Sequence, residues 1–310
     1  MKPLRIGTRG SKLALIQAGM VADALKAAHP GLEVETVVIQ TSGDWKPEQG
    51  ETRLSEAEGG KGLFAREIEQ AILAGSVDCG VHSLKDMPAV LPEGLVIHHT
   101  LERADVRDVL ILNEPCRNIE DLPKGTTIGT SSLRRQAILL SLRNDLKISP
   151  LRGNVPTRIE KIRAKQVDAG VLAYAGLVRL GLESEASLIL EPEIMLPAAT
   201  QGIIGIEIRT GDNLVSGLFD SIHHRETGWA AAAERAALAT LDGSCRTPIG
   251  AYATLSGSDL YLRVLVASPD GARLFRDEQS GPVQSDDDAA NLGRLVGLRL
   301  KARVPQDIFL

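Results

Sequence analysis

The segment from Thr127 to Arg158 (TIGTSSLRRQAILLSLRNDLKISPLRGNVPTR) constrains the fold more than any other part of the chain. A short strand-like run ends at Gly129, and three hydroxyl side chains then supply N-cap candidates before apolar residues at helical spacing. The pattern repeats, because Gly153 precedes Asn154, a second N-cap candidate, and a proline lies in the first turn that follows. Two strand-to-helix corners in succession predict an α/β fold.

Both corners carry arginine where a helix begins. The backbone N–H groups and the positive end of the helix dipole favour an anion there, whereas each cation costs roughly a few tenths of a kcal/mol. Arg134 and Arg135 break this rule in the first helix, and Arg152 and Arg158 flank the start of the second. An anionic ligand bound between the arginines and the N–H groups would compensate. The alternative is that the arginines form a solvated helix face.

Composition narrows the class of anion. The chain has 310 residues, of which 43% are hydrophobic and 3% aromatic, and its net charge is -5. An acidic chain with few aromatic residues lacks the basic surface and the stacking platform that nucleic acids require, so we expect a local basic pocket for a small anion. No apolar run is long enough to span a membrane. We therefore expect neither a nucleic-acid nor a membrane partner.

The cysteines and histidines do not indicate a metal or disulfide framework. The chain has three cysteines, Cys79, Cys116 and Cys245, and they are widely spaced. An odd number at such spacing does not suit a disulfide framework, so a reducing compartment fits better. The first residues show no secretory signal pattern, so we expect a cytoplasmic protein. The adjacent histidine pairs at 98–99 and 223–224 point to different faces, and no metal site is expected.

Two further helix starts before residue 100 offer anion contacts. Arg9 and Ser11 follow a short strand and precede a helix, in the same arrangement as the corners above. The polar stretch 42–60 predicts a lid, because a loop of this length inside a compact domain is functional or mobile. Lys61 and Phe64 follow it at the next helix start, where Lys61 could hold an anion and Phe64 pack in the core or against the lid.

A buried strand predicted at 77–81 leads to Lys85 and Asp86. In open α/β sheets ligands bind beyond the carboxyl ends of the strands, which is where this pair would lie. The sequence therefore predicts that the pair belongs to a ligand site. A surface ion pair between the two side chains is the alternative.

The character of the chain changes after residue 210. Two helices near 212–224 and 226–241 precede a glycine-containing loop, and strands with alternating polarity and a last helix near 287–302 follow. This pattern predicts a small α+β unit with an antiparallel sheet. Cys245 lies in the loop beside Arg246, and a neighbouring cation favours the nucleophilic thiolate. We interpret Cys245 as an attachment point for a covalent group, with an inert loop cysteine as the alternative.

The motifs together resemble those of the porphobilinogen deaminase family, also called hydroxymethylbilane synthases. Eight segments occur in the family's order: TRGSKLAL, GGKGLFARE, VHSLKDMP, IGTSSLRRQ, LRGNVPTR, LAYAGLVRLG, LPAATQGIIGIE and LDGSCRTPIGAYA. The resemblance implies two similar βα domains of the type II periplasmic-binding-protein kind and a small C-terminal α+β domain with an antiparallel sheet. It places domain 1 at 1–101 and 201–222, domain 2 at 102–200 and domain 3 at 223–310.

The resemblance also implies a reaction. Members of the family carry one dipyrromethane cofactor, joined by a thioether to the cysteine that here is Cys245. They condense four porphobilinogen molecules head to tail on this primer, release ammonia each time, and free hydroxymethylbilane by hydrolysis. The catalytic aspartate falls on Asp86, with Lys85 beside it. A fixed carboxylate would bind pyrrole N–H groups, stabilise the charge that forms as ammonia leaves, and take part in proton transfer.

The remaining implied site residues suit the substrate, because each pyrrole carries two carboxylates and guanidinium groups bind carboxylates in bidentate geometry. The implied cofactor contacts are Lys85, Thr130, Ser131, Ser132, Arg134, Arg135, Arg152 and Gly153. The implied substrate contacts are Arg9, Ser11, Lys61, Phe64, Arg152, Arg158, Arg179 and Gln201. The implied partners are porphobilinogen and the growing linear pyrrole chain, with no obligate protein partner. Thr200 departs from the pattern, since a glycine is common there.

Two other functions fit parts of the sequence. A non-catalytic two-domain binding protein or sensor for a small polycarboxylate would also have paired βα domains and an arginine-rich cleft. The loop position of Cys245 and the lack of a secretory signal favour the enzyme. A nucleic-acid-binding protein is the third possibility, and the acidic balance and scarce aromatic residues oppose it.

Overall fold

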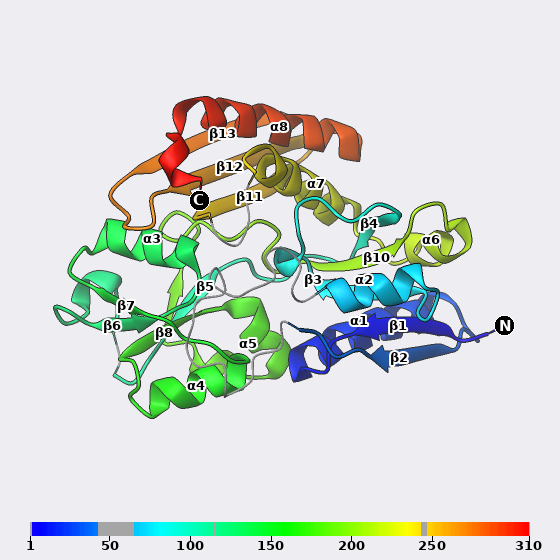
Figure 1. Ribbon diagram of the computed structural model, residues 1–310, viewed down its shortest axis with the longest axis horizontal. Helices are drawn as coiled ribbons and strands as arrows, with labels where there is room; N and C mark the ends of the chain where they lie inside the picture. The colour runs from blue at the N-terminus through cyan, green and yellow to red at the C-terminus, as the bar shows by residue number, and fades with distance from the viewer. Residues whose placement is uncertain (1, 43–64, 115, 243–246, 310) are drawn as a thin grey trace.

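The computed structural model describes residues 2–42, 65–114, 116–242 and 247–309, and it places three β-sheets in this part of the chain (Figure 1). The first sheet has the strand order β2-β1-β3-β10-β4. Its strands are β1 (Leu4–Thr8), β2 (Val34–Val38), β3 (Cys79–Ser83), β4 (Leu95–Thr100) and β10 (Ile204–Arg209). The strands β1, β2 and β3 are parallel, and β10 runs antiparallel to both of its neighbours.

Helices cover both faces of the first sheet. The helices α1 (Lys12–Ala28) and α6 (Asn213–Asp220) share one apolar core with β1, β3 and β10. On the opposite face α2 (Arg66–Leu73) packs through Ile68 and Ile72. Because side chains alternate along a strand, each strand of this sheet presents one set of residues to α1 and the other set to α2.

The second sheet repeats this arrangement with the order β7-β6-β8-β5-β9. Its strands are β5 (Asp108–Leu112), β6 (Thr127–Gly129), β7 (Lys147–Ser149), β8 (Ala169–Ala173) and β9 (Leu188–Leu190). Its helices are α3 (Leu133–Leu142), α4 (Val155–Arg163) and α5 (Tyr174–Leu180), with short 3₁₀ turns at Ile119–Asp121 and Glu183–Glu185. Here β5 is the strand that runs antiparallel to its neighbours, as β10 does in the first sheet.

The two sheets correspond residue by residue along part of their length. Gly80 of β3 pairs with Gly7 of β1, and Gly170 of β8 pairs with Gly129 of β6. Residues of α2 and β3 therefore correspond to residues of α4 and β8 whose numbers are higher by 90. The sequences Val-Asp-Cys-Gly and Val-Asp-Ala-Gly end at the two glycines.

The third sheet is antiparallel and consists of β11 (Ile249–Ser256), β12 (Asp259–Ala267) and β13 (Leu274–Pro282). The helices α7 (Arg225–Thr240) and α8 (Asp286–Arg303) contribute with this sheet to a separate apolar core, and a 3₁₀ turn at Gln306–Ile308 closes it. The predicted α/β class, with two mixed sheets and a C-terminal antiparallel sheet, is confirmed.

Candidate active site

The turn after β3 presents an exposed carboxylate at the edge of the first sheet. A 3₁₀ turn, η3 (Leu84–Asp86), follows the strand directly, and Leu84 is buried while Asp86 is exposed. The backbone N–H of Leu84 donates to the carbonyl of Ile203 at 3.0 Å, which ties the turn to the start of β10. Arg235 of α7 donates from Nη2 to the carbonyls of Pro88 and Ala89 at 2.9 and 3.1 Å. The Asp86 turn is therefore fixed from two sides.

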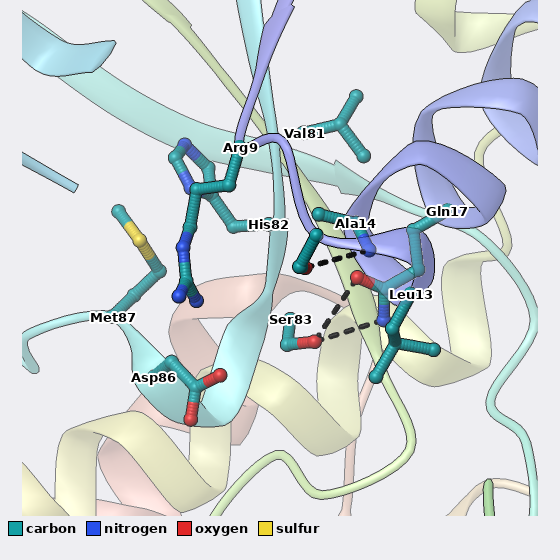
Figure 2. Close-up of a pocket in the computed structure, with 10 residues that line it drawn as sticks. Arg9, Leu13, Ala14, Gln17, Val81, His82, Ser83, Asp86 and Met87 are labelled. Carbon is teal, nitrogen blue, oxygen red and sulfur yellow. Dashed lines mark hydrogen bonds between the residues drawn. The ribbon is translucent and has the colours of Figure 1, made fainter. Parts of the chain in front are cut away.

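A pocket opens beside Asp86 and includes the first predicted corner (Figure 2). Arg9 and Ser11 line it, and Ser11 caps α1 by accepting from the N–H of Ala14 at 3.3 Å. Figure 2 shows the side chain of Arg9 extending from the β1–α1 loop toward Asp86. The structure thus brings these three predicted site residues together.

Lys85, the residue before Asp86, does not form an ion pair with Asp86 among the described residues. Its Nζ donates to Oε1 of Gln201 at 3.3 Å. Burial, with a smaller contribution from the nearby Arg135 guanidinium, lowers the pKa of Lys85 to about 8. The surface ion pair considered from sequence is therefore wrong.

Arg134 and Arg135 are buried, so a solvated helix face is wrong for both of them. The side chain of Ser132 caps α3, as predicted. Each arginine donates from Nη2 to one oxygen of Asp108, and both distances are 2.7 Å. Their Nη1 groups donate to the carbonyls of Leu196 and Val171 at 2.7 and 2.9 Å. The anion that compensates the helix-start arginines is thus first of all a carboxylate of the protein itself.

Asp108 joins the two sheets, and the sequence prediction missed it. It is fully buried at the start of β5, and burial raises its pKa less than the two arginines lower it. Gln201 donates from Nε2 to Oδ1 of Asp108 at 2.9 Å and accepts from Lys85, so a continuous chain of bonds leads from the Asp86 turn to α3. An aspartate opening the apolar strand DVLIL was the available sequence signal.

Three buried guanidinium nitrogens near this network have no hydrogen-bond partner among the described residues. They are Nε of Arg134, Arg135 and Arg179. Arg179 donates from Nη2 to the carbonyl of Gly202 at 2.7 Å, and burial lowers its pKa to about 10. Buried donors of this kind are costly unless a ligand satisfies them, and carboxylates match them best.

The hydroxyl groups of the first arginine corner largely serve the backbone. Thr130 accepts from the N–H of Ser132 at 3.2 Å. Ser131 donates to the carbonyl of Leu151 and accepts from its N–H, each at 3.2 Å, which holds the two corners side by side. Thr130, Ser131 and Ser132, the three predicted donors, therefore hold the backbone of the two corners in place.

The second arginine corner has the predicted geometry. Asn154 caps α4 by accepting from the N–H of Thr157 at 3.0 Å. Gly153 has φ of 110°, and a Cβ there would come within 2.9 Å of Thr157, so only glycine fits. Arg152 is buried, and Arg158 donates from Nε to the carbonyl of Gly153 at 2.8 Å.

Several predictions lie outside the described residues. These are Cys245, Lys61, Phe64 and most of the proposed lid at 42–60. Among the residues that are described, no helix is long and apolar enough to cross a membrane, and no group of histidine, cysteine or acidic side chains could hold a metal ion.

Sequence reasoning also missed a polar pair in the pocket. Gln17 of α1 donates from Nε2 to Oγ of Ser83 at 2.8 Å, and both residues line the pocket (Figure 2). A lone glutamine on a helix face carries no distinctive signal, because only the fold brings it to the end of β3.

Family models match most of the chain. A model described as "Porphobilinogen deaminase, dipyromethane cofactor binding domain" matches residues 4–216, and one described as "Porphobilinogen deaminase, C-terminal domain" matches residues 229–302.

Solved structures with a similar fold are distant. A putative periplasmic sulfonate-binding protein from Methylobacillus flagellatus is 15% identical, with 76% of this chain and 67% of that chain covered and a TM-score of 0.39. An ancestral cationic amino acid solute binding protein is 18% identical, with coverages of 71% and 88% and a TM-score of 0.43. The second substrate binding domain of a putative amino acid transporter from Streptococcus pneumoniae is 14% identical, with coverages of 71% and 92% and a TM-score of 0.44.

Proposed function

The chain belongs to the porphobilinogen deaminase family, enzymes of tetrapyrrole biosynthesis with a dipyrromethane cofactor, and we propose that Asp86 is its catalytic carboxylate. One observation carries this assignment. The exposed carboxylate of Asp86 on the first sheet is joined through Lys85, Gln201 and Asp108 to the buried arginines of the second sheet. A carboxylate and a cluster of cations thus meet at one edge, which suits a cationic reaction centre on a substrate that carries carboxylates.

The arginine set fits the family's cofactor. Three cations, Lys85, Arg134 and Arg135, surround one buried carboxylate, that of Asp108, and so leave an excess of positive charge. The unsatisfied Nε groups add donors that acetate and propionate side chains would satisfy. When bound, the dipyrromethane supplies a nucleophilic ring carbon from which the chain grows. We propose that the thiol of Cys245 holds it.

The protein's own groups then have separate tasks. Asp86 accepts hydrogen bonds from pyrrole N–H groups, stabilises positive charge where ammonia leaves, and takes the proton that is released. Lys85 has a pKa near 8, so it is mostly charged at neutral pH and supports an anion at the same edge. Arg9, Arg158 and Arg179 bind the carboxylates of porphobilinogen and of the growing pyrrole chain, with Ser11 and Gln201 as neutral partners. Thr130, Ser131, Ser132, Arg152 and Gly153 hold the cofactor end.

The proposal extends to domain boundaries and location. Domain 1 at 1–101 and 201–222 is supported by β10, which completes the first sheet after the chain has formed the second. The separate core beneath α7 and α8 supports domain 3 at 223–310, and domain 2 occupies 102–200. A reducing cytoplasm suits a reactive thiol at Cys245. We infer no obligate protein partner.

Intact-protein mass spectrometry tests the proposal directly. We expect a mass that exceeds the sequence mass by two pyrrole units, and Cys245→Ser should remove the excess. Cys116→Ser is the matched control, because that side chain is a free, partly exposed thiol and its removal should leave the excess in place. An active protein with the bare sequence mass would refute the covalent cofactor.

A further inference from the structure

A cluster of three buried ionisable side chains lies between the first sheet and α2. Glu207 of β10 is fully buried, and Glu69 of α2 and His82 of β3 are buried at 6% and 7% exposure. Oε2 of Glu207 lies 3.1 Å from Nε2 of His82. Gly80 makes room for the imidazole, since a Cβ there would lie 2.7 Å from its Nε2. The cluster is thus a built feature of this face of the sheet.

The two carboxylates are incompletely satisfied. Oε1 of Glu69 and Oε1 of Glu207 are both buried without a hydrogen-bond partner among the described residues. Two ionised carboxylates in one buried site repel each other, and a proton bound by one of them removes most of that cost. Burial and the charge of Glu207 raise the pKa of Glu69 to about 7, while His82 acts in the opposite sense. A proton is therefore gained and lost here near neutral pH.

The cluster reaches the Asp86 pocket through His82. This residue lines the pocket together with Arg9 and Asp86, and all three are labelled in Figure 2. Only Nε2 is engaged with Glu207, and Nδ1 has no hydrogen-bond partner within the described residues. An imidazole with one nitrogen on a carboxylate and the other free can pass a proton between them.

The fold itself does not need these polar groups. The 90-residue correspondence places Ile159 and Leu172 of the second sheet at the positions of Glu69 and His82. Glu207 pairs with Gly80, whereas Ile111 pairs with Gly170. The same packing between helix and sheet is thus achieved with apolar residues alone.

We propose that the Glu69–Glu207 pair takes up and returns one proton in each condensation, and that His82 carries this proton between the pair and the Asp86 pocket. The inference rests on the proposed function. In each condensation the C–N bond of porphobilinogen breaks, a C–C bond forms, and the C–H bond at the attacking ring carbon releases a proton to Asp86. His82 then accepts that proton on one ring nitrogen and gives the proton of its other nitrogen to Glu207. Glu207 later returns the proton through His82 to the pocket, where ammonia or solvent takes it. Asp86 is by then ionised again and can accept the proton of the next condensation.

Other charges face the cluster from two elements. Glu67 on α2 adds negative charge near Glu69. Arg235 on α7 lies close enough to Glu207 to be stabilised by it, while burial lowers the pKa of this arginine to about 10. The wild-type kcat should therefore fall as pH decreases through about 7, because a protonated pair cannot accept a further proton.

The test compares His82→Gln with His99→Gln. His99 is a matched control, because it is equally buried on the same sheet, bonds to Asp220 at 2.9 Å and is not among the residues that line the pocket. We expect His82→Gln to retain the cofactor mass and to keep KM within about twofold, but to lose at least about tenfold in kcat, a bound set below the roughly 100-fold low end of general acid–base effects. His99→Gln should keep the wild-type kcat. A kcat for His82→Gln within twofold of wild type would overturn the proposal.

Two further variants keep the test decisive if His82→Gln folds poorly. Glu69→Gln should abolish the decline in kcat near pH 7, and an unchanged pH profile would overturn the proposal. The triple variant Glu69→Ile, His82→Leu, Glu207→Ile copies the second sheet, and it should fold yet lose at least tenfold in kcat. Retained kcat in the folded triple variant would also overturn the proposal.

Failure of the proposed function would give a different result. In that case Cys245→Ser would keep the wild-type mass excess, or the wild-type protein would not release ammonia.

Discussion

The first and second sheets have the same strand order and helix packing but opposite chemistry. After β3 the first sheet places Lys85 and Asp86, whereas after β8 the second sheet has Ala175 and Gly176 at the corresponding positions. The helix starts differ in the reverse sense. Two and three residues after its N-cap, α1 has Leu13 and Ala14, whereas α3 has two arginines. One architecture thus supplies an exposed carboxylate after β3 in one half and a buried pair of arginines at the start of α3 in the other.

The interior of the two halves differs in the same way. Beneath α2 the first sheet buries two glutamates and a histidine, and beneath α4 the second buries isoleucine and leucine. The second sheet's only buried acid at its centre, among the described residues, is Asp108, and it balances arginines. The comparison indicates that the shared architecture does not require these polar groups, since each of them is absent from one of its two copies.

The largest expected effect is on catalysis at the turn that only the first sheet uses. Asp86→Asn should lower kcat by at least about 100-fold, because the amide cannot accept a proton or stabilise positive charge. The melting temperature should stay near wild type, since Asp86 is exposed and the matching position of the second half, in the first turn of α5, is Gly176. Steady-state kinetics and thermal unfolding check this. A rate within tenfold of wild type would show that the carboxylate is not what distinguishes the two halves.

The next largest effect is on the free energy of unfolding, through Asp108 of the second sheet. Asp108→Asn should cost about 3–5 kcal/mol in the free energy of unfolding, because it leaves two buried guanidinium groups without their carboxylate. Asp145→Asn is the control, since its pair with Arg143 is partly exposed, and it should cost clearly less than Asp108→Asn. Chemical denaturation near pH 7 measures both, and equal losses would contradict the buried network.

The pH dependence of that network has a definite sign. The arginines hold the pKa of Asp108 below its ordinary value, so the ionised carboxylate contributes stability above pH 4 that is lost as the pH falls further.

The third effect is on the pH dependence of stability, through Glu69 on the buried face of α2. The pKa of Glu69 is raised from 4.5 to about 7, so the folded protein binds more protons than the unfolded chain between these values. Wild-type stability should therefore fall as pH rises from about 4.5 to 7, by up to about 3 kcal/mol, and this contribution should stay constant above pH 7. Glu69→Ile copies the second sheet and should flatten the curve. Parallel pH–stability curves for the two proteins would show that Glu69 is ionised throughout.

Local patterns account for the features that sequence predicted well. Ser11 and Asn154 are predicted N-caps and Ser132 is one of three candidates, because a cap depends on neighbouring residues only, and all three accept the expected backbone N–H. The three-residue strands β7 and β9 are too short for alternation to reveal them.

The contacts that define the site depend instead on long-range pairing. His82 and Glu207 are 125 residues apart, and only the insertion of β10 beside β3 brings them together. The sequence predicts an anionic ligand at Arg134 and Arg135, and that ligand stays a prediction, whereas the structure shows an internal carboxylate between them. The sequence analysis did not include Asp108. This residue belongs to β5, more than 20 residues before α3, and only the pairing of β5 with β8 places it in the second sheet.

The smallest expected effect lies in the crossover that returns the chain from the second sheet to the first. Thr200 has φ of 60°, a left-handed conformation that costs a β-branched residue about 1–3 kcal/mol. Thr100, at the end of β4, is equally buried at 2% exposure but is not among the described residues with positive φ. Thr200→Gly should therefore cost at least about 1 kcal/mol less in unfolding free energy than Thr100→Gly, because glycine relieves strain at only the first position. Denaturant titration of the two variants measures the difference, and equal costs would mean that the crossover stores no strain between the two halves.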